Sequence, residues 1–163
     1  MNSMKKHSLT RLARLSIVAA VYVVLTFSLG FMSYGGIQFR IAEALMLLCF
    51  YKKDYGISMI IGCLIANMFS PMFAVDMLFG TLATALAVLL IYVSPNIYVA
   101  SLAPVITNAF IVGAELHFFY DLPYWLSTLQ VAFGELVCVS ALGVIIFKSL
   151  EKNKRFMELV KKD

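Results

Sequence analysis

The feature that most constrains this chain is a run of 38 residues, from residue 77 to residue 114, without a charged side chain. A membrane-spanning helix needs only about 20 apolar residues, so this run is too long for one helix and long enough for two. Ser94-Pro95-Asn96 divides it, because proline and asparagine favour a turn. Of all 163 residues, 62% are hydrophobic and 13% are charged, whereas a soluble domain carries roughly 25% charged residues. The sequence therefore predicts an all-α, polytopic membrane protein.

Charges, glycines and prolines mark the ends of the other apolar runs. The 25 residues between Arg14 and Arg40 are uncharged, and glycines place a loop over 31–38. The next run is short and contains Arg40 and Glu43, so we expect a tilted or shallow helix there. Pro71 breaks a helix, and Pro123 suits the first turn of the last one. We predict a single integral membrane domain over 1–163 with six transmembrane helices, at residues 12–31, 37–51, 55–70, 76–93, 97–115 and 123–147, a polar and aromatic loop at 117–121, and a basic tail.

The distribution of lysine and arginine predicts the orientation. With six spans, twelve of the thirteen cations fall on the side that holds both termini and the loop after residue 51. The positive-inside rule makes that side cytoplasmic. We therefore expect a multi-pass protein of the bacterial inner membrane with both termini in the cytoplasm. The membrane-embedded and outer part keeps one arginine against five carboxylates, a net charge of −4.

Ionisable side chains at membrane depth are the candidate functional residues, because inserting each one costs roughly 2.5–3.5 kcal/mol. Arg40 and Glu43 share a helix face, where they either form a structural ion pair or order the rim of a pocket. Asn108 and Glu115 are two helical turns apart on one stripe. Glu115 is a candidate ligand contact or a solvated interfacial carboxylate, and Asn108 could equally bond to a neighbouring helix.

Glu135 is the costliest residue, because it lies about twelve residues into its span without a charge nearby in the sequence. It needs a proton, a partner or a ligand to neutralise it. Asn67 and Asp76 flank the break at Pro71, where exposed backbone is tolerated if it lines a cavity. The aromatic residues near the outer rim form either an interfacial belt or a stacking lid; they include Tyr120 and Trp125.

Several patterns of enzymes and metalloproteins do not occur in the sequence. There is no Gly-rich phosphate loop, no His/Cys metal cluster and no nucleophile–base motif. We therefore expect no enzymatic activity and no cofactor, and active transport would take its energy from partners. The three cysteines lie in apolar runs without paired spacing and are interpreted as core fillers. Ser16 and Ala20 form a small-xxx-small pair, which lets another helix approach closely.

Motifs along residues 10–148 resemble the signature of the QueT family. They are Gly36-Ile37-Gln38-Phe39-Arg40-Ile41-Ala42-Glu43-Ala44-Leu45, Gly62-Cys63-Leu64-Ile65-Ala66-Asn67, Asp76-Met77-Leu78-Phe79-Gly80-Thr81-Leu82-Ala83-Thr84 and, more loosely, Asn108-Ala109-Phe110-Ile111-Val112-Gly113-Ala114-Glu115-Leu116 and Gly134-Glu135. The resemblance implies a six-helix S-component, the substrate-capture subunit of an energy-coupling factor (ECF) importer. Its partners would be a transmembrane T-subunit and two cytoplasmic ATPases, with the face of Ser16 and Ala20 docking on the T-subunit.

The resemblance also implies a substrate, a queuosine precursor of the deazaguanine type with an aminomethyl group. An acidic outer region with amides suits such a cation and its donor-rich guanine edge. We expect Glu115 to be the main anionic contact; the other candidate substrate-binding residues are Asn108, Asp76, Glu135, Asn67, Arg40, Glu43, Gln38, Tyr120 and Trp125. Two alternatives stay open: an S-component for another vitamin-like nutrient, and a small membrane scaffold or accessory protein without a ligand.

Overall fold

The computed structural model describes residues 2–30 and 39–161 and the side chains of residues 8–30 and 39–161, and the regular elements within these ranges are all helices. The all-α expectation is therefore confirmed. Four helices are long and apolar enough to cross a membrane, and two further apolar helices are shorter. The four long ones are α1 (Asn2–Ser28), α5 (Phe73–Val93), α6 (Ile97–Tyr120) and a composite helix of α7 (Tyr124–Glu135), η2 (Leu136–Gly143) and α8 (Val144–Glu151).

The two shorter helices follow one another in the chain. The first consists of a 3-10 segment, η1 (Ile41–Leu47), that continues into α3 (Leu48–Tyr51), and the second is α4 (Tyr55–Asn67). Residues 37 and 38, the start predicted for the first of them, and the predicted loop over 31–38 lie outside the described residues. Arg40 precedes η1 with a non-helical backbone, so the predicted inclusion of Arg40 in the helix is wrong.

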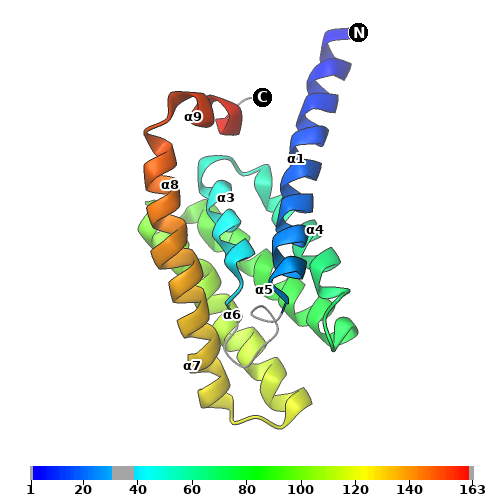
Figure 1. The fold of residues 1–163 in the computed structure, drawn as a ribbon, viewed down its shortest axis with the longest axis vertical. Helices are drawn as coiled ribbons and strands as arrows, with labels where there is room; N and C mark the ends of the chain where they lie inside the picture. Colours follow the sequence, from blue (N-terminus) through cyan, green and yellow to red (C-terminus); the bar gives the residue numbers. More distant parts are fainter. Residues whose placement is uncertain (1, 31–38, 162–163) are drawn as a thin grey trace.

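The helices surround the short η1–α3 helix. Along the chain, α1 packs on α4, α4 on α5, α5 on α6 and α6 on α7, while η1 contacts α1, α4, α6, η2 and α8 (Figure 1). The short helix is enclosed because it carries Glu43 and directly follows Arg40, and a lipid-facing position would tolerate neither side chain. Its packing is tight: a Cβ added at Gly143 of η2 would lie 3.3 Å from the Cβ of Ala44.

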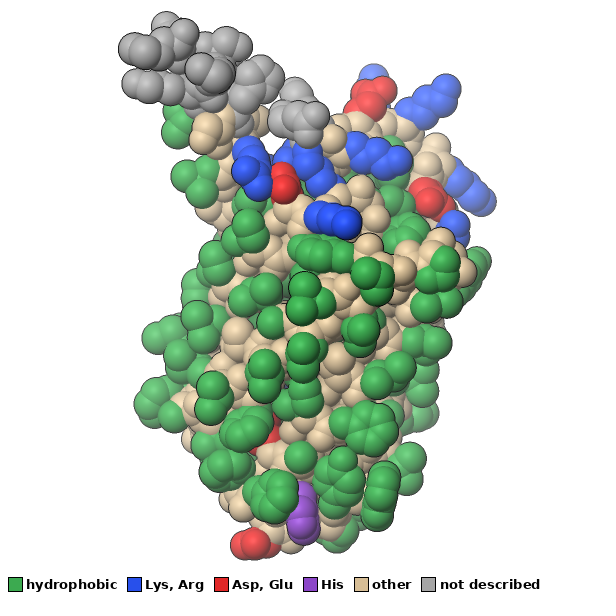
Figure 2. All heavy atoms as spheres, turned by 180° about the vertical axis from the view of Figure 1, so that it is seen from behind, with side chains coloured by type: hydrophobic (Ala, Val, Ile, Leu, Met, Phe, Trp, Pro, Cys, Tyr) green, Lys and Arg blue, Asp and Glu red, His purple; other side chains and the backbone are tan. Residues whose placement is uncertain are grey.

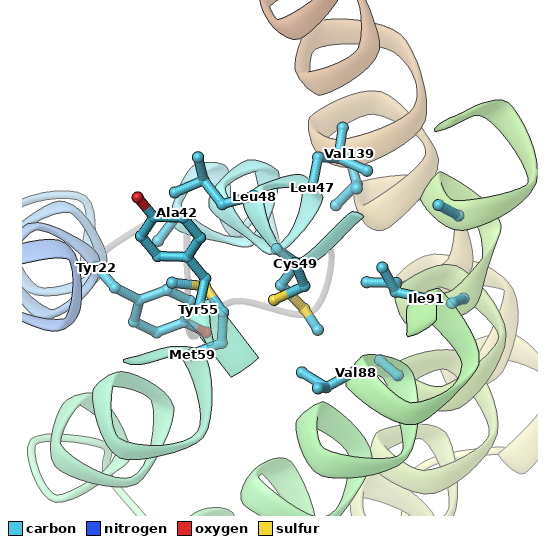
Figure 3. Packing of buried hydrophobic residues seen from close by; sticks show 14 of the residues in the cluster. Tyr22, Ala42, Leu47, Leu48, Cys49, Tyr55, Met59, Val88, Ile91 and Val139 are labelled. Carbon is cyan, nitrogen blue, oxygen red and sulfur yellow. The ribbon is translucent and has the colours of Figure 1, made fainter. Parts of the chain in front are cut away.

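An apolar core surrounds the short helix. It is built around the short helix by residues of α1, α3, α4, α5 and η2, among them Tyr22, Cys49, Met59, Val88, Ile91 and Val139 (Figure 3). The outer surface is also rich in large apolar side chains, as expected for helices that face lipid (Figure 2). Lysine and arginine gather at the end of the molecule that holds α9 and the start of α1 (Figures 1 and 2).

One expectation about the end of a helix is wrong. The predicted loop at 117–121 is largely the last turn of α6, which continues to Tyr120 because Asp121 adopts the left-handed conformation (φ 54°) that closes a helix end. The basic tail also folds, as α9 (Lys154–Lys161), whose strongly amphipathic sequence buries Val160. Tyr55 donates a hydrogen bond to the carbonyl of Val160 (3.2 Å), which holds α9 against the start of α4.

Candidate functional site

Charged and amide side chains from five helices and the residue before η1 converge in the bundle. We call Arg40, Glu43, Asn67, Asp76, Asn108, Glu115 and Glu135 the central polar cluster. Six of these seven residues are buried, and four of the six are ionisable; Asp76 is half-buried. The sequence marked each as a candidate, and the structure brings all seven together.

Arg40 lies at the centre of the cluster. Its guanidinium interacts electrostatically with Glu43 and Glu135, and also with Glu115. One of its terminal nitrogens would lie 3.8 Å from a Cβ added at Gly80, so α5 approaches the guanidinium closely where it lacks a side chain. A buried arginine needs anionic partners to offset its lost hydration. The carboxylates around it supply them, and they outnumber it.

Glu43 is fully buried and is bound by the first helix. The hydroxyl of Tyr22 donates a hydrogen bond to Oε1 of Glu43, whereas Oε2 has no hydrogen-bond partner in the part of the chain that the structure describes. α4 leaves room for the tyrosine ring, because a Cβ added at Gly62 would lie 3.1 Å from the Cβ of Tyr22. The helix pair α1 and α4 therefore fixes one carboxylate oxygen and leaves the other available.

Glu135 and Asn108 form the second fixed contact. The amide Nδ2 of Asn108 donates to Oε1 of Glu135 over 2.7 Å, and Oε2 of Glu135 has no hydrogen-bond partner. Glu135 is the last residue of α7, immediately before the π-helical segment η2. Such segments are frequent at functional sites, because they interrupt the regular side-chain spacing of the helix. The carboxylate is thus held in place by an uncharged amide.

Asn67 joins α4 to the start of α5. Its Nδ2 donates to the backbone carbonyl of Asp76 (2.9 Å) and to Sγ of Cys63 (3.4 Å), while its Oδ1 has no hydrogen-bond partner. A Cβ added at Gly80 would lie 2.5 Å from Nδ2, so glycine is required there. The hydroxyl of Thr84 donates to the same sulfur (3.1 Å), so Cys63, which packs in the apolar core as predicted, also contacts the polar site.

Glu115 and Asp76 meet near the end of the bundle opposite to α9. Asp76 lies in the first turn of α5 and Glu115 lies close to the end of α6. Their carboxyl groups interact directly, and Oε1 of Glu115 is buried without a hydrogen-bond partner. Tyr120, which is partly exposed, interacts electrostatically with both carboxyl groups. Two adjacent carboxylates repel each other unless a proton or a cation lies between them.

The cluster as a whole carries more acceptors than the described residues satisfy. Buried oxygens without a partner are Oε2 of Glu43, Oδ1 of Asn67, Oε1 of Glu115 and Oε2 of Glu135. Buried polar atoms are normally hydrogen-bonded, and each unpaired one costs roughly 1–3 kcal/mol. Four such atoms in one cluster leave hydrogen-bond acceptors that no described residue of the protein satisfies.

The remaining candidates are not part of the central polar cluster as defined above. Gln38 is outside the described residues. Trp125 is 69% exposed and packs edge-on against Tyr124, away from the central polar cluster. Ser16 and Ala20 are exposed on α1, as a docking face requires. The sequence analysis did not identify Tyr22 and Thr84 as residues of the site. A signal was available for Tyr22, because it lies deep inside a span, whereas tyrosines of membrane proteins are enriched at the interfacial ends.

The chain is similar in sequence to known proteins. The family model described as "QueT transporter" matches residues 12–152. The chain belongs to the QueT transporter family. A relative named "Queuosine precursor transporter QueT", from Lactococcus lactis subsp. cremoris (strain MG1363), is 33% identical over 166 residues, covering 92% of this chain and 97% of the relative. No solved structure matches. The QueT family and the apolar helices make this a membrane transport protein rather than an enzyme.

Replacing Tyr22 with Phe should destabilise the protein, because Oε1 of Glu43 loses its buried donor. We expect the free energy of unfolding to fall by about 1–3 kcal/mol, measured as a lower midpoint of chemical denaturation in detergent. The matched control is Tyr98→Phe, an exposed tyrosine of α6, which should leave the midpoint unchanged. Equal midpoints for all three proteins would show that this hydrogen bond contributes nothing to stability.

Proposed function

We propose that this chain is the substrate-capture subunit, or S-component, of an ECF importer for a queuosine precursor, an aminomethyl deazaguanine. The observation that carries this proposal is the central polar cluster, in which buried carboxylate and amide oxygens have no hydrogen-bond partner among the described residues. The name of the Lactococcus lactis relative supports the choice of substrate.

The chemistry of the cluster suits this substrate class. A guanine-type ring presents adjacent N–H donors and a carbonyl acceptor, and the aminomethyl group is a cation at neutral pH. Carboxylates of Glu43 and Glu135 can accept from such donors, and Arg40 can donate to a carbonyl oxygen. Hydrogen bonds to charged groups in a desolvated site contribute roughly 1.5–3 kcal/mol each. A ligand of this kind would therefore satisfy the atoms that the described protein residues leave unpaired.

We further propose a topology of six spans in a single membrane domain over 1–163, in the bacterial inner membrane with both termini cytoplasmic. The four long helices and the two shorter ones support this number. Exposed basic side chains on α9, which lies at the same end of the bundle as the start of α1, support a cytoplasmic location for that end (Figure 1). The central polar cluster would then open toward the outer side.

The partners in this proposal are a transmembrane T-subunit and two cytoplasmic ATPases. The sequence has no phosphate-binding loop, so another subunit must bind and hydrolyse ATP. Ser16 and Ala20 are exposed on α1, and a small-residue face allows a second helix to pack closely in a membrane. This face is our proposed docking surface for the T-subunit.

Binding to the purified chain tests the proposed substrate. Titration calorimetry with 7-aminomethyl-7-deazaguanine should detect binding, and Glu115→Gln and Glu135→Gln should each weaken it by roughly ten- to a hundredfold, because each loses a charged acceptor. The control, Glu151→Gln, changes an exposed glutamate that pairs with Lys148 and should keep the parental affinity. If the chain binds only other vitamin-like compounds, its substrate is another nutrient. If it binds none of the compounds, the alternative of an accessory scaffold is favoured.

Cysteine labelling tests the topology. Single cysteines in place of Ser8 and Glu158, both exposed, should react with an impermeant maleimide only in opened cells. A cysteine in place of Asp121, at the other end of the bundle, should react in intact cells. The three native cysteines are buried, so the background should be low. Labelling of position 8 or 158 in intact cells would reverse the proposed orientation.

Replacement of Ala20 with Leu tests the docking face. The larger side chain should hinder close helix packing, so co-purification with the T-subunit and uptake should both fall while ligand affinity of the isolated chain is unchanged. Ala141→Leu, at an exposed alanine of η2, is the control and should affect neither. A parallel loss of ligand affinity in Ala20→Leu would place this face in the fold core.

A further inference from the structure

The central polar cluster divides into two parts. The distal pair consists of Asp76 and Glu115, and the inner group consists of Arg40, Glu43, Asn108 and Glu135. Asn108 and Glu115 are seven residues apart on α6, so their backbone positions differ by roughly 10 Å along the helix. That separation is comparable with the length of a two-ring base that carries a short arm.

The two parts also differ in how their charges are compensated. In the inner group, Arg40 interacts with both carboxylates, Tyr22 donates to Glu43, and Asn108 donates to Glu135. In the distal pair, the carboxyl groups of Glu115 and Asp76 interact with each other. Arg40 also interacts with Glu115, but its positive charge is shared with the two carboxylates of the inner group. The distal pair therefore has the larger unmet demand for positive charge.

Two buried oxygens, one within the distal pair and one on Asn67, lack a hydrogen-bond partner among the described residues. Oε1 of Glu115 has no hydrogen-bond partner, although this side chain is 2% exposed. Oδ1 of Asn67 is equally unpaired, on a side chain whose Nδ2 donates to the backbone carbonyl of Asp76. A primary ammonium has three N–H donors and one positive charge, so it can bond to several of these oxygens while it offsets the repulsion between the carboxyl groups.

We propose that the distal pair binds the ammonium arm of the substrate, whereas the inner group binds the edge of its ring system. The inference rests on the proposed function and adds the orientation of the substrate. Asp76 and Glu115 then determine specificity: they distinguish a deazaguanine with a cationic arm from one with a neutral substituent at the same carbon. The inner group contributes equally to the binding of both.

Three ligands that differ only at this carbon test the assignment: 7-aminomethyl-, 7-cyano- and unsubstituted 7-deazaguanine. Affinities are measured by calorimetry for the parent protein and for Glu115→Gln, Asp76→Asn and Glu135→Gln, with melting temperatures recorded on the same preparations. The parent should prefer the aminomethyl compound, and this preference should fall by roughly ten- to a hundredfold in Glu115→Gln and in Asp76→Asn. Glu135→Gln should weaken all three ligands alike and keep the preference.

The other possible results distinguish a wrong orientation of the substrate from a wrong proposed function. An unchanged preference in both distal variants, or a lost preference in Glu135→Gln, overturns the assigned orientation while the proposed function stands. A loss in Glu115→Gln alone overturns the paired site. A parent protein that binds none of the three compounds overturns the proposed function itself. The substitutions are nearly isosteric and remove a repulsive charge, so the distal variants should fold, and the melting temperatures check this.

Discussion

The electrostatic interaction between Arg40 and the carboxylates around it is the constraint on which the rest of the structure depends. An arginine at membrane depth is tolerated only when neighbouring groups replace its water shell. Glu43 and Glu135 supply opposite charge, and they come from different parts of the chain. The short η1–α3 helix must therefore be enclosed by the other helices, and α7 and η2 must approach it. The arrangement of the helices around a polar centre follows from this requirement.

The polar centre in turn explains which small residues are needed. Gly80 keeps α5 close to Asn67, and Gly62 accommodates the ring of Tyr22. The first helix contributes to two surfaces at once, because Tyr22 points into the bundle while Ser16 and Ala20 remain exposed. Ligand binding and partner docking are thus properties of opposite faces of one helix in the proposed function.

Much of this architecture could be predicted from the sequence because the bilayer imposes strong rules. The long uncharged runs, Pro71 and Ser94-Pro95-Asn96 located the helices. The cost of charge at membrane depth selected five of the residues that converge, and their positions selected Asn67 and Asn108. Features that depend on tertiary contacts could not be predicted in the same way. The folding of α9 depends on contact with Tyr55, the 3-10 and π segments have no sequence signature, and the roles of Tyr22 and Cys63 appear only when α1, α4 and α5 are adjacent. Tyr120 and Trp125 are both exposed aromatic residues, and composition alone did not show that Tyr120 is the one near the site.

The π-helical segment η2 sets how the two halves of the last span are oriented. Its i→i+5 hydrogen bonds enclose one residue more than those of an α-helix, and one residue corresponds to a rotation of about 100°. Glu135 before the segment and Cys138 and Val139 within it can thus face separate targets, the polar cluster and the apolar core. A deletion of a single residue here would hardly alter hydropathy or length, yet it would turn Glu135 away from Asn108. Hydropathy profiles are insensitive to such a change, so the register of this span carries information that composition does not.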